Sequence, residues 1–321
     1  MTDTLVQDPA ALLGSGPYRL VTRSDFDGLV CAVLLRQAGL IDDITFVHPK
    51  DVQDGTVEIT DRDVLTNLPF DPRAHLVFDH HLSETVRNGA SERHVIDPSA
   101  PSAARVVHTF LGGPERVPGV SYGLMRAVDQ ADSADYSLED VLEPTGWTLL
   151  NFLMDSRTGL GRFRDFRISN YQLMMQLIDH CIEYQDVDEI LALPDVAERV
   201  ELYRAQADLF REQLLRVTTL HGDVAVVDLR DEDVIHAGNR FLVYALFPQA
   251  RVSVHVMWGR DKQNTVLAVG RSILDRSSTV DIGAVCLAHG GGGHAAAGTC
   301  QVAHEDAERS LTEVVAALRG R

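Results

Sequence analysis

The chain has few cysteines and no long apolar run. Its 321 residues include four cysteines, Cys31, Cys181, Cys286 and Cys300, and none of them forms a CxxC pair. This argues against a disulfide scaffold and predicts a reducing, cytoplasmic location. The first nine residues are polar and acidic, and the apolar stretch at 10–13 is short. We therefore expect no signal peptide, no membrane span and no membrane partner.

An excess of positive charge is also absent. The chain carries 29 basic and 47 acidic residues, which gives a net charge of −18. Because a broadly acidic protein repels long polyanions, we expect no long nucleic acid as a partner. Small phosphorylated molecules remain compatible with this charge where a cleft is locally basic.

What is present is the composition of an ordinary globular protein, with 45% hydrophobic and 24% charged residues, and a length that allows two cores. Short apolar strands alternate with helical patterns, which predicts an α/β fold with a doubly wound parallel sheet. We place a first domain at 15–193, a helical connector at 194–220 and a smaller α/β domain at 221–321. The strands expected in the first domain are Tyr18–Thr22, Asp43–Val47, Asp63–Leu68, Ala74–Phe78 and Glu92–Ile96.

Two polar motifs follow predicted strands. The triplet Asp79-His80-His81 comes directly after Val77-Phe78, so it lies at the carboxyl edge of the sheet, where α/β folds bind ligands. The alternative is that this triplet is an ordinary polar turn after a strand and binds no ligand. The turn Asp25-Phe26-Asp27-Gly28 precedes a helix, and its two carboxylates suit a hard cation. One Asp at this place would instead serve as an ordinary helix N-cap.

Two further motifs lie later in the chain. Asp129 and Asp132 follow a predicted helix that begins near Val120. The run Gly290 to Gly293 is followed by His294 and small residues, which predicts a loop that approaches an anion and a helix start that holds it. A flexible linker is the alternative, but the segment leads on to a strand at 299–302.

In this order, the four motifs resemble the DHH–DHHA1 phosphoesterase superfamily over nearly the whole chain. The resemblance implies that 15–193 is a DHH domain that binds Mn²⁺ or Mg²⁺ and that 221–321 is a DHHA1 substrate-binding domain. It implies a phosphoesterase or phosphodiesterase, related to short-oligonucleotide hydrolases and exopolyphosphatases. It also raises a homodimer as an assembly to test.

The resemblance assigns roles to individual residues. The candidate metal ligands are Asp25, Asp27, Asn67, His80 and Asp129. Asp79 would orient a histidine, and His81 would contact a phosphate oxygen or move a proton. The substrate phosphate would be held by Arg157, Arg271, Gly291, Gly292, Gly293 and His294. For Arg157, a solvated basic loop is an equal alternative.

Two positions depart from the family pattern. Arg23 stands where the family has a metal-binding His, and arginine offers no lone pair to a metal. Asn67 stands where the family has a bridging Asp, and a neutral amide is a poor bridge between two dications. We therefore expect one ion, with Arg23 paired to Asp25 and supplying a fixed positive charge in the catalytic site. A shifted register, with Asp61 or Asp63 as the bridge, is the alternative.

Two functions remain open at this point. The first is a metal-dependent hydrolase of a short phosphate ester, such as an oligoribonucleotide, a nucleoside bisphosphate, a cyclic dinucleotide or a short polyphosphate. The second is a catalytically impaired regulatory protein that binds a nucleotide or phosphate in the same cleft. Retention of the Asp-His-His triplet and His294 favours the hydrolase, whereas Arg23 and Asn67 favour the second function.

Overall fold

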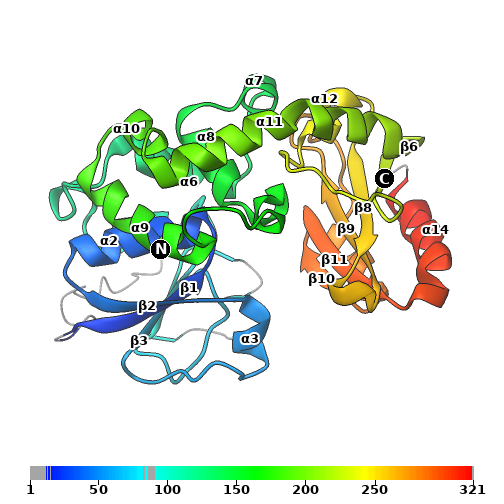
Figure 1. The fold of residues 1–321 in the computed structure, drawn as a ribbon. Coiled ribbons are helices and arrows are strands. Elements are labelled where there is room, and N and C mark those ends of the chain that lie inside the picture. Colours follow the sequence, from blue (N-terminus) through cyan, green and yellow to red (C-terminus); the bar gives the residue numbers. More distant parts are fainter. Residues whose placement is uncertain (1–11, 13, 15, 82–83, 86–90, 320–321) are drawn as a thin grey trace. The chain divides into compact units, whose positions relative to one another are not determined.

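The computed structural model describes residues 12, 14, 16–81, 84–85 and 91–319, which divide into two compact units (Figure 1). Unit 1 takes the described residues of Met1–Asp135, Thr145–Ser156 and Phe163–Val200. Unit 2 takes those of Tyr136–Pro144, Arg157–Arg162 and Glu201–Arg321. Residue 15, where we predict the start of the first domain, lies outside the described residues. Within those residues, every helix is too short or too polar to cross a bilayer.

Unit 1 contains a five-stranded parallel sheet in the order β2-β1-β3-β4-β5. This order confirms the predicted doubly wound sheet, and it places the switch point, where ligands bind in such folds, between β1 and β3. The strands are β1 (Tyr18–Arg23), β2 (Ile41–Val47), β3 (Asp63–Thr66), β4 (Leu76–Asp79) and β5 (His94–Ile96). The helices are α2 (Phe26–Gln37), α3 (Pro49–Gln53), α5 (Ala103–Phe110), α6 (Tyr122–Asp132), α8 (Gly146–Met154), α9 (Asn170–Glu183) and α10 (Val187–Leu191).

The sheet of unit 1 has a core on each face. On one face, Val21, Leu65 and Val77 pack with Val52 of α3. On the other face, α2 and α5 cover the strands, and Phe78 meets Phe110 edge-on with ring centroids 5.0 Å apart. Ten of the twelve residues of α2 are buried, which explains why its sequence is apolar on all sides.

Unit 2 contains a six-stranded sheet in the order β10-β11-β9-β8-β7-β6, in which only β7 and β8 pair in parallel. The strands are β6 (Thr218–His221), β7 (Val224–Asp228), β8 (Val252–Trp258), β9 (Thr265–Arg271), β10 (Gly292–His294) and β11 (Ala297–Val302). The helices are α7 (Leu138–Leu142), α12 (Leu242–Leu246), α13 (Ile282–Ala288) and α14 (Ala307–Leu318), and α11 (Pro194–Val217) connects the two units. One face of this sheet forms a core with residues of α13 and α14.

The segment after His294 differs from the sequence-based prediction. The small residues expected to start a helix form instead the turn of a hairpin between β10 and β11. Gly293 adopts a φ of +156°, and a Cβ atom on it would lie 2.3 Å from the Ala297 carbonyl oxygen. The glycine run is therefore needed for close strand pairing, and the expected helix start is wrong.

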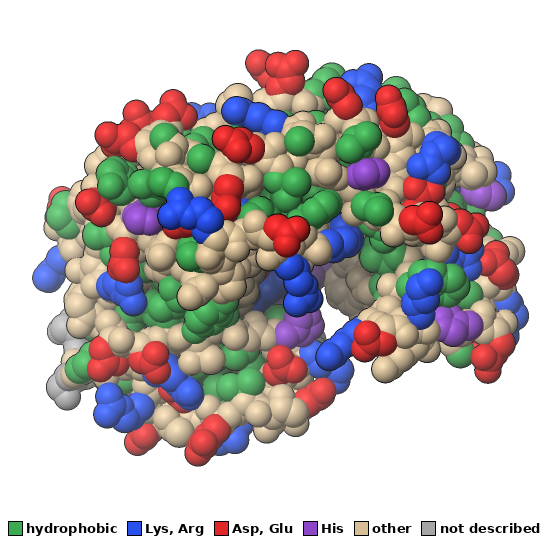
Figure 2. Space-filling model, viewed as in Figure 1, with side chains coloured by type: hydrophobic (Ala, Val, Ile, Leu, Met, Phe, Trp, Pro, Cys, Tyr) green, Lys and Arg blue, Asp and Glu red, His purple; other side chains and the backbone are tan. Residues whose placement is uncertain are grey.

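The acidic excess of the chain is distributed over the surface. Figure 2 shows Asp and Glu side chains interspersed with Lys and Arg side chains on the face that it presents. Many arginines are paired to carboxylates, and in unit 1 Arg19 donates two hydrogen bonds to Asp63, at 2.7 and 2.8 Å. Asp63 is 1% exposed and also accepts hydrogen bonds from Thr60.

Removal of Arg19 should destabilise unit 1, because the Asp63 carboxylate would stay buried without its cation. We expect Arg19→Met to lower the free energy of unfolding by about 3 kcal/mol. The matched control is Arg36→Met at the exposed Arg36–Asp179 pair, with an expected loss below ~1 kcal/mol. Urea unfolding followed by circular dichroism measures both losses. Equal losses in the two variants would contradict the prediction.

The same pair should give a pH dependence. Burial raises the pKa of Asp63, but hydrogen bonds from Arg19 and Thr60 outweigh it and hold that pKa below 3.8. A carboxylate with a lowered pKa stabilises the folded state above its unfolded pKa, and that contribution is lost as the pH falls through the folded value. The difference between wild type and Arg19→Met should therefore shrink below about pH 4.

Candidate active site

The turn between β1 and α2 positions two carboxylates at the switch point of the sheet. Asp25 is the N-cap of α2, and its Oδ1 accepts a hydrogen bond from the Gly28 N–H at 3.0 Å. A Cβ atom on Gly28 would lie 2.0 Å from the Arg23 carbonyl oxygen, so only glycine allows the helix to start this close to β1. Asp25 therefore has the N-cap role, while Asp27 points into the protein.

Asp27 is a buried carboxylate held by a helix N-terminus. It is 3% exposed, and it accepts hydrogen bonds from the backbone N–H groups of Ala103 and Ala104, at 3.1 and 2.8 Å, in the first turn of α5. Burial, and then the charges of Asp132 and Asp25, raise the pKa of Asp27 well above its usual value. A bound cation would favour the charged form and relieve this repulsion.

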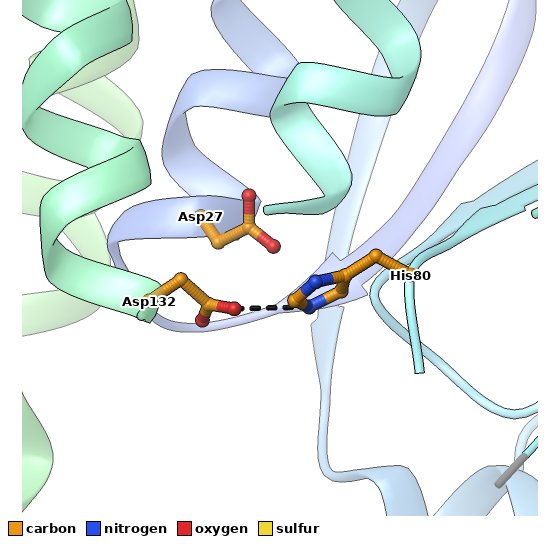
Figure 3. Close-up of side chains that lie close together, drawn as sticks. All are labelled: Asp27, His80 and Asp132. Atoms are coloured by element: carbon orange, nitrogen blue, oxygen red, sulfur yellow. Dashed lines mark ion pairs between the residues drawn. The ribbon is translucent and has the colours of Figure 1, made fainter. Parts of the chain in front are cut away.

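His80 faces Asp27 and Asp132, as Figure 3 shows. Its Nδ1 lies 3.1 Å from the Ala100 carbonyl oxygen, which favours a proton on Nδ1, and its Nε2 lies 2.9 Å from Asp132 Oδ2. Burial lowers the pKa of His80, but Asp132 and Asp27 outweigh burial and raise it to about 9. In the absence of a metal, the imidazole of His80 is therefore the positively charged group that faces Asp27 and Asp132.

These three side chains form a group that could hold a metal ion. One ligand atom from each of Asp27, His80 and Asp132 lies within 4.8 Å of the others. Carboxylate oxygens and an imidazole nitrogen suit Mn²⁺, and carboxylates suit Mg²⁺. Two buried oxygens at the ends of neighbouring strands, Asp79 Oδ2 and Asn67 Oδ1, have no hydrogen-bond partner among the described residues. The donor set therefore fits a divalent cation.

The rest of the Asp-His-His triplet is held by Asp79. Its Oδ1 accepts hydrogen bonds from the backbone N–H groups of His80 and His81, and it lies 2.7 Å from His81 Nδ1. Asp79 is fully buried, so this contact fixes the orientation of the His81 ring. The geometry leaves Nε2 of His81 directed away from Asp79.

The structure brings Asp132, and not Asp129, next to His80. Both residues lie on α6, three positions apart. Asp129 accepts hydrogen bonds from the Ser102 hydroxyl at 2.8 Å and from Arg105, and these contacts occupy both of its oxygens. Sequence reasoning notes Asp132 in the same motif but assigns the ligand to Asp129. The contacts that hold Asp129 away from His80 come from Ser102 and Arg105, which lie more than twenty residues earlier in the chain.

The two unusual positions of the motifs are close to this group. Arg23 Nε lies 3.1 Å from Asp25 Oδ2, which is the expected pair, and the Arg23 side chain is 38% exposed. Asn67 follows β3, is 2% exposed and has a φ of +55°. Asp63 begins the same strand and pairs with Arg19, so it lies at the opposite edge of the sheet and does not support the shifted register.

The predicted phosphate contacts lie in unit 2. The Arg271 backbone N–H donates to the Ala296 carbonyl oxygen at 2.9 Å, which places Arg271 beside the turn that follows His294. The Arg271 guanidinium donates to the Val280 carbonyl oxygen and has no carboxylate partner among the described residues. Gly292, Gly293 and His294 are exposed on β10.

Arg157 lies elsewhere in unit 2, in a short 3₁₀ turn at Ser156–Thr158. The Thr158 carbonyl oxygen in that turn accepts a hydrogen bond from the Gly238 N–H at 3.0 Å. In unit 1, Phe166 is covered by the buried Arg199, whose Cζ lies 4.0 Å from the ring centroid. Phe166 is therefore part of the packing around the buried Arg199.

Comparison with known proteins identifies the family. No protein-family model and no curated protein sequence matches the chain. Among solved structures, the chain is 57% identical to the pGpG-specific phosphodiesterase PggH from Vibrio cholerae, over 94% of this chain and 98% of that chain, with a TM-score of 0.80.

Two more distant structures share the fold. The DHH domain of a protein described as a member of a ribosomal-protein family is 14% identical, over 95% of this chain and 87% of that chain, with a TM-score of 0.54. RecJ from Thermus thermophilus, in complex with Mn²⁺, is 16% identical, over 98% of this chain and 55% of that chain, with a TM-score of 0.50. The chain therefore belongs to the DHH phosphoesterase superfamily and is a metal-dependent phosphoesterase.

Proposed function

We propose that the chain hydrolyses the linear dinucleotide pGpG to two molecules of GMP with one divalent cation. The observation that carries this proposal is the 57% identity to a pGpG-specific phosphodiesterase over nearly the full length of both chains. The group formed by Asp27, His80 and Asp132 supports it, because these side chains supply ligands for one ion. The acidic net charge agrees with a short substrate rather than a long nucleic acid.

In this proposal Asp27, His80 and Asp132 hold Mn²⁺ or Mg²⁺. When bound, the ion would polarise the phosphate and lower the pKa of an attacking water. Ala103 and Ala104 hold the Asp27 carboxylate in place through their N–H groups. Asp79 orients His81, whose Nε2 then contacts a phosphate oxygen or gives a proton to the leaving ribose oxygen.

Arg23 supports the single-ion proposal on grounds of charge. A second ion would bring two positive charges and would need carboxylates to screen its repulsion from the first. Asn67 is neutral and cannot provide that screening. Arg23 uses Nε to contact Asp25, and its half-exposed guanidinium has further donors for a phosphate oxygen. It thus supplies one fixed positive charge in place of a second ion.

A binding protein without turnover is the weaker candidate. Arg23 and Asn67 suggest it, yet neither residue removes a ligand atom from the group of Asp27, His80 and Asp132. We therefore favour the hydrolase.

Purified protein with Mn²⁺ should release GMP from pGpG. Little or no product should form from cyclic di-GMP, adenosine bisphosphate or short polyphosphate under the same conditions. His80→Ala should lower kcat by roughly 100-fold or more, because it removes a metal ligand. The matched control is His221→Ala, at an exposed position of β6, which should leave kcat unchanged. Absence of product from every substrate, with tight binding of pGpG, would instead support the binding protein.

Calorimetric titration with Mn²⁺ tests the ligands and the ion count. We expect one ion per chain and a loss of affinity of roughly 10- to 100-fold or more in Asp132→Asn. Asp129→Asn is the matched control on the same helix, and it should keep most of the affinity because Asp129 is held by Ser102 and Arg105. Two ions per chain, or a larger loss in Asp129→Asn, would contradict the assignment.

A further inference from the structure

Two of the four cysteines meet in the core of unit 2. Cys286 lies in the last turn of α13, Cys300 lies on β11, and both side chains belong to the buried cluster that these elements form with the sheet. Their exposed fractions are 0% and 1%. The Cys286 thiol donates a hydrogen bond to the Cys300 sulfur, so the two sulfur atoms are in contact. Neither thiol takes part in the proposed hydrolysis.

Glycine residues bring the two cysteines together. A Cβ atom on Gly298 would lie 2.8 Å from Cys286 Sγ, so α13 lies directly against β11 at this position. Gly298 and Cys300 are two residues apart and therefore face the same side of the strand. The Gly291 N–H donates to the Cys286 carbonyl oxygen at 2.9 Å, and a Cβ atom on Gly291 would lie 2.7 Å from Cys300 Cβ. Close packing at two glycines thus holds Cys286 against Cys300.

The pair lies under the edge of the sheet. Gly291 lies against Cys300, and the edge strand β10 follows it directly. All three residues of β10 are exposed, and the strand pairs with β11 only over Gly292–His294. A short, exposed edge strand that begins with two glycines opens at lower free energy than the centre of the sheet. A small molecule therefore reaches the two sulfur atoms without unfolding of the whole unit.

The hydrogen bond makes the two thiols chemically unequal. Because Cys286 donates, this bond outweighs burial and lowers the pKa of Cys300. The same bond, together with burial, raises the pKa of Cys286. The thiolate is the form that reacts with oxidants, so Cys300 is the attacking thiol and Cys286 is the neighbour that can resolve the product. Disulfides that form in a reducing compartment are transient and often serve redox sensing.

We propose that Cys286 and Cys300 form a site of reversible oxidation, at which hydrogen peroxide converts the two thiols into a disulfide. The Cys300 thiolate attacks one peroxide oxygen, the O–O bond breaks, water leaves and Cys300 becomes a sulfenic acid. The Cys286 sulfur then attacks the Cys300 sulfur, so that the S–S bond forms, the S–O bond breaks and a second water leaves. The two thiols lose two electrons and two protons in total, and the peroxide is reduced to two molecules of water. A dithiol reductant reverses the change by exchange.

The disulfide acts on the β10–β11 hairpin because α13 is bonded to that hairpin at both ends. At the start of α13, the Ile282 N–H donates to the Ala295 carbonyl oxygen at 3.1 Å, and near its end Cys286 accepts from Gly291. A disulfide brings its two sulfur atoms to about 2.05 Å, which is closer than a hydrogen bond allows. Its formation must therefore move α13 relative to β11, and the hairpin that carries His294 moves with it.

Mass spectrometry of the folded protein after treatment with hydrogen peroxide tests the site. We expect a disulfide between Cys286 and Cys300, while Cys31 and Cys181 of unit 1 stay reduced. In Cys286→Ala the reaction should stop at a sulfenic acid on Cys300, which dimedone traps. The matched control is Cys181→Ala, which removes an equally buried thiol on α9 and should leave the disulfide unchanged. Oxidation of Cys286 and Cys300 no faster than that of Cys31 and Cys181 would overturn the proposal.

Kinetics on pGpG test the effect on the hairpin, and this part of the inference rests on the proposed function. The protein is oxidised, the peroxide is removed and Mn²⁺ is then added. Oxidation should raise KM roughly 10-fold in the wild type and in Cys181→Ala, and dithiothreitol should restore it. Cys300→Ala should show no such change. An unchanged KM in fully disulfide-bonded protein would overturn the coupling to the hairpin. Failure of the reduced wild type to cleave pGpG would overturn the proposed function, and mass spectrometry would still decide whether the oxidation site exists.

Discussion

The unit 1 site depends on how the buried carboxylate of Asp27 is held. The carboxylate lies at the start of α2 and is fixed by the first N–H groups of α5. It faces His80 after β4 and Asp132 at the end of α6. A negative charge at this depth is tolerated only where N–H groups and a cation surround it. The elements that meet at this point are therefore arranged around one charge.

Much of unit 1 could be predicted from the sequence because its signals are local. The strands are short apolar runs, and the residues that follow them are polar. The sequence therefore predicts that Asp25, Asp27 and Asp79-His80-His81 lie at the carboxyl edge of the sheet. The sequence also offers an N-cap role for Asp25 as an alternative to metal binding. In the structure Asp25 is the N-cap of α2 and also pairs with Arg23.

What could not be predicted depends on contacts between distant residues. Asp129 and Asp132 are equivalent by pattern, and only the positions of Ser102 and Arg105 decide which of them faces His80. The glycine run predicts a loop that leads to a helix, although it forms a hairpin strand whose partner is β11. The sequence of strand β6 follows directly on the helical pattern of α11 and gives no separate strand signal. Its strand conformation depends on pairing with β7. Local propensity does not encode such partners.

Each unit contains two buried cysteines that can report the opening of that unit. All four thiols are free and buried, with Cys31 and Cys181 in unit 1 and Cys286 and Cys300 in unit 2. Burial raises the pKa of Cys31 and of Cys181, so these thiols are protected both by exclusion of reagent and by protonation. A thiol reagent therefore labels a cysteine when its unit opens. Peptide mapping of the label then separates the opening of one unit from that of the other without any engineered probe.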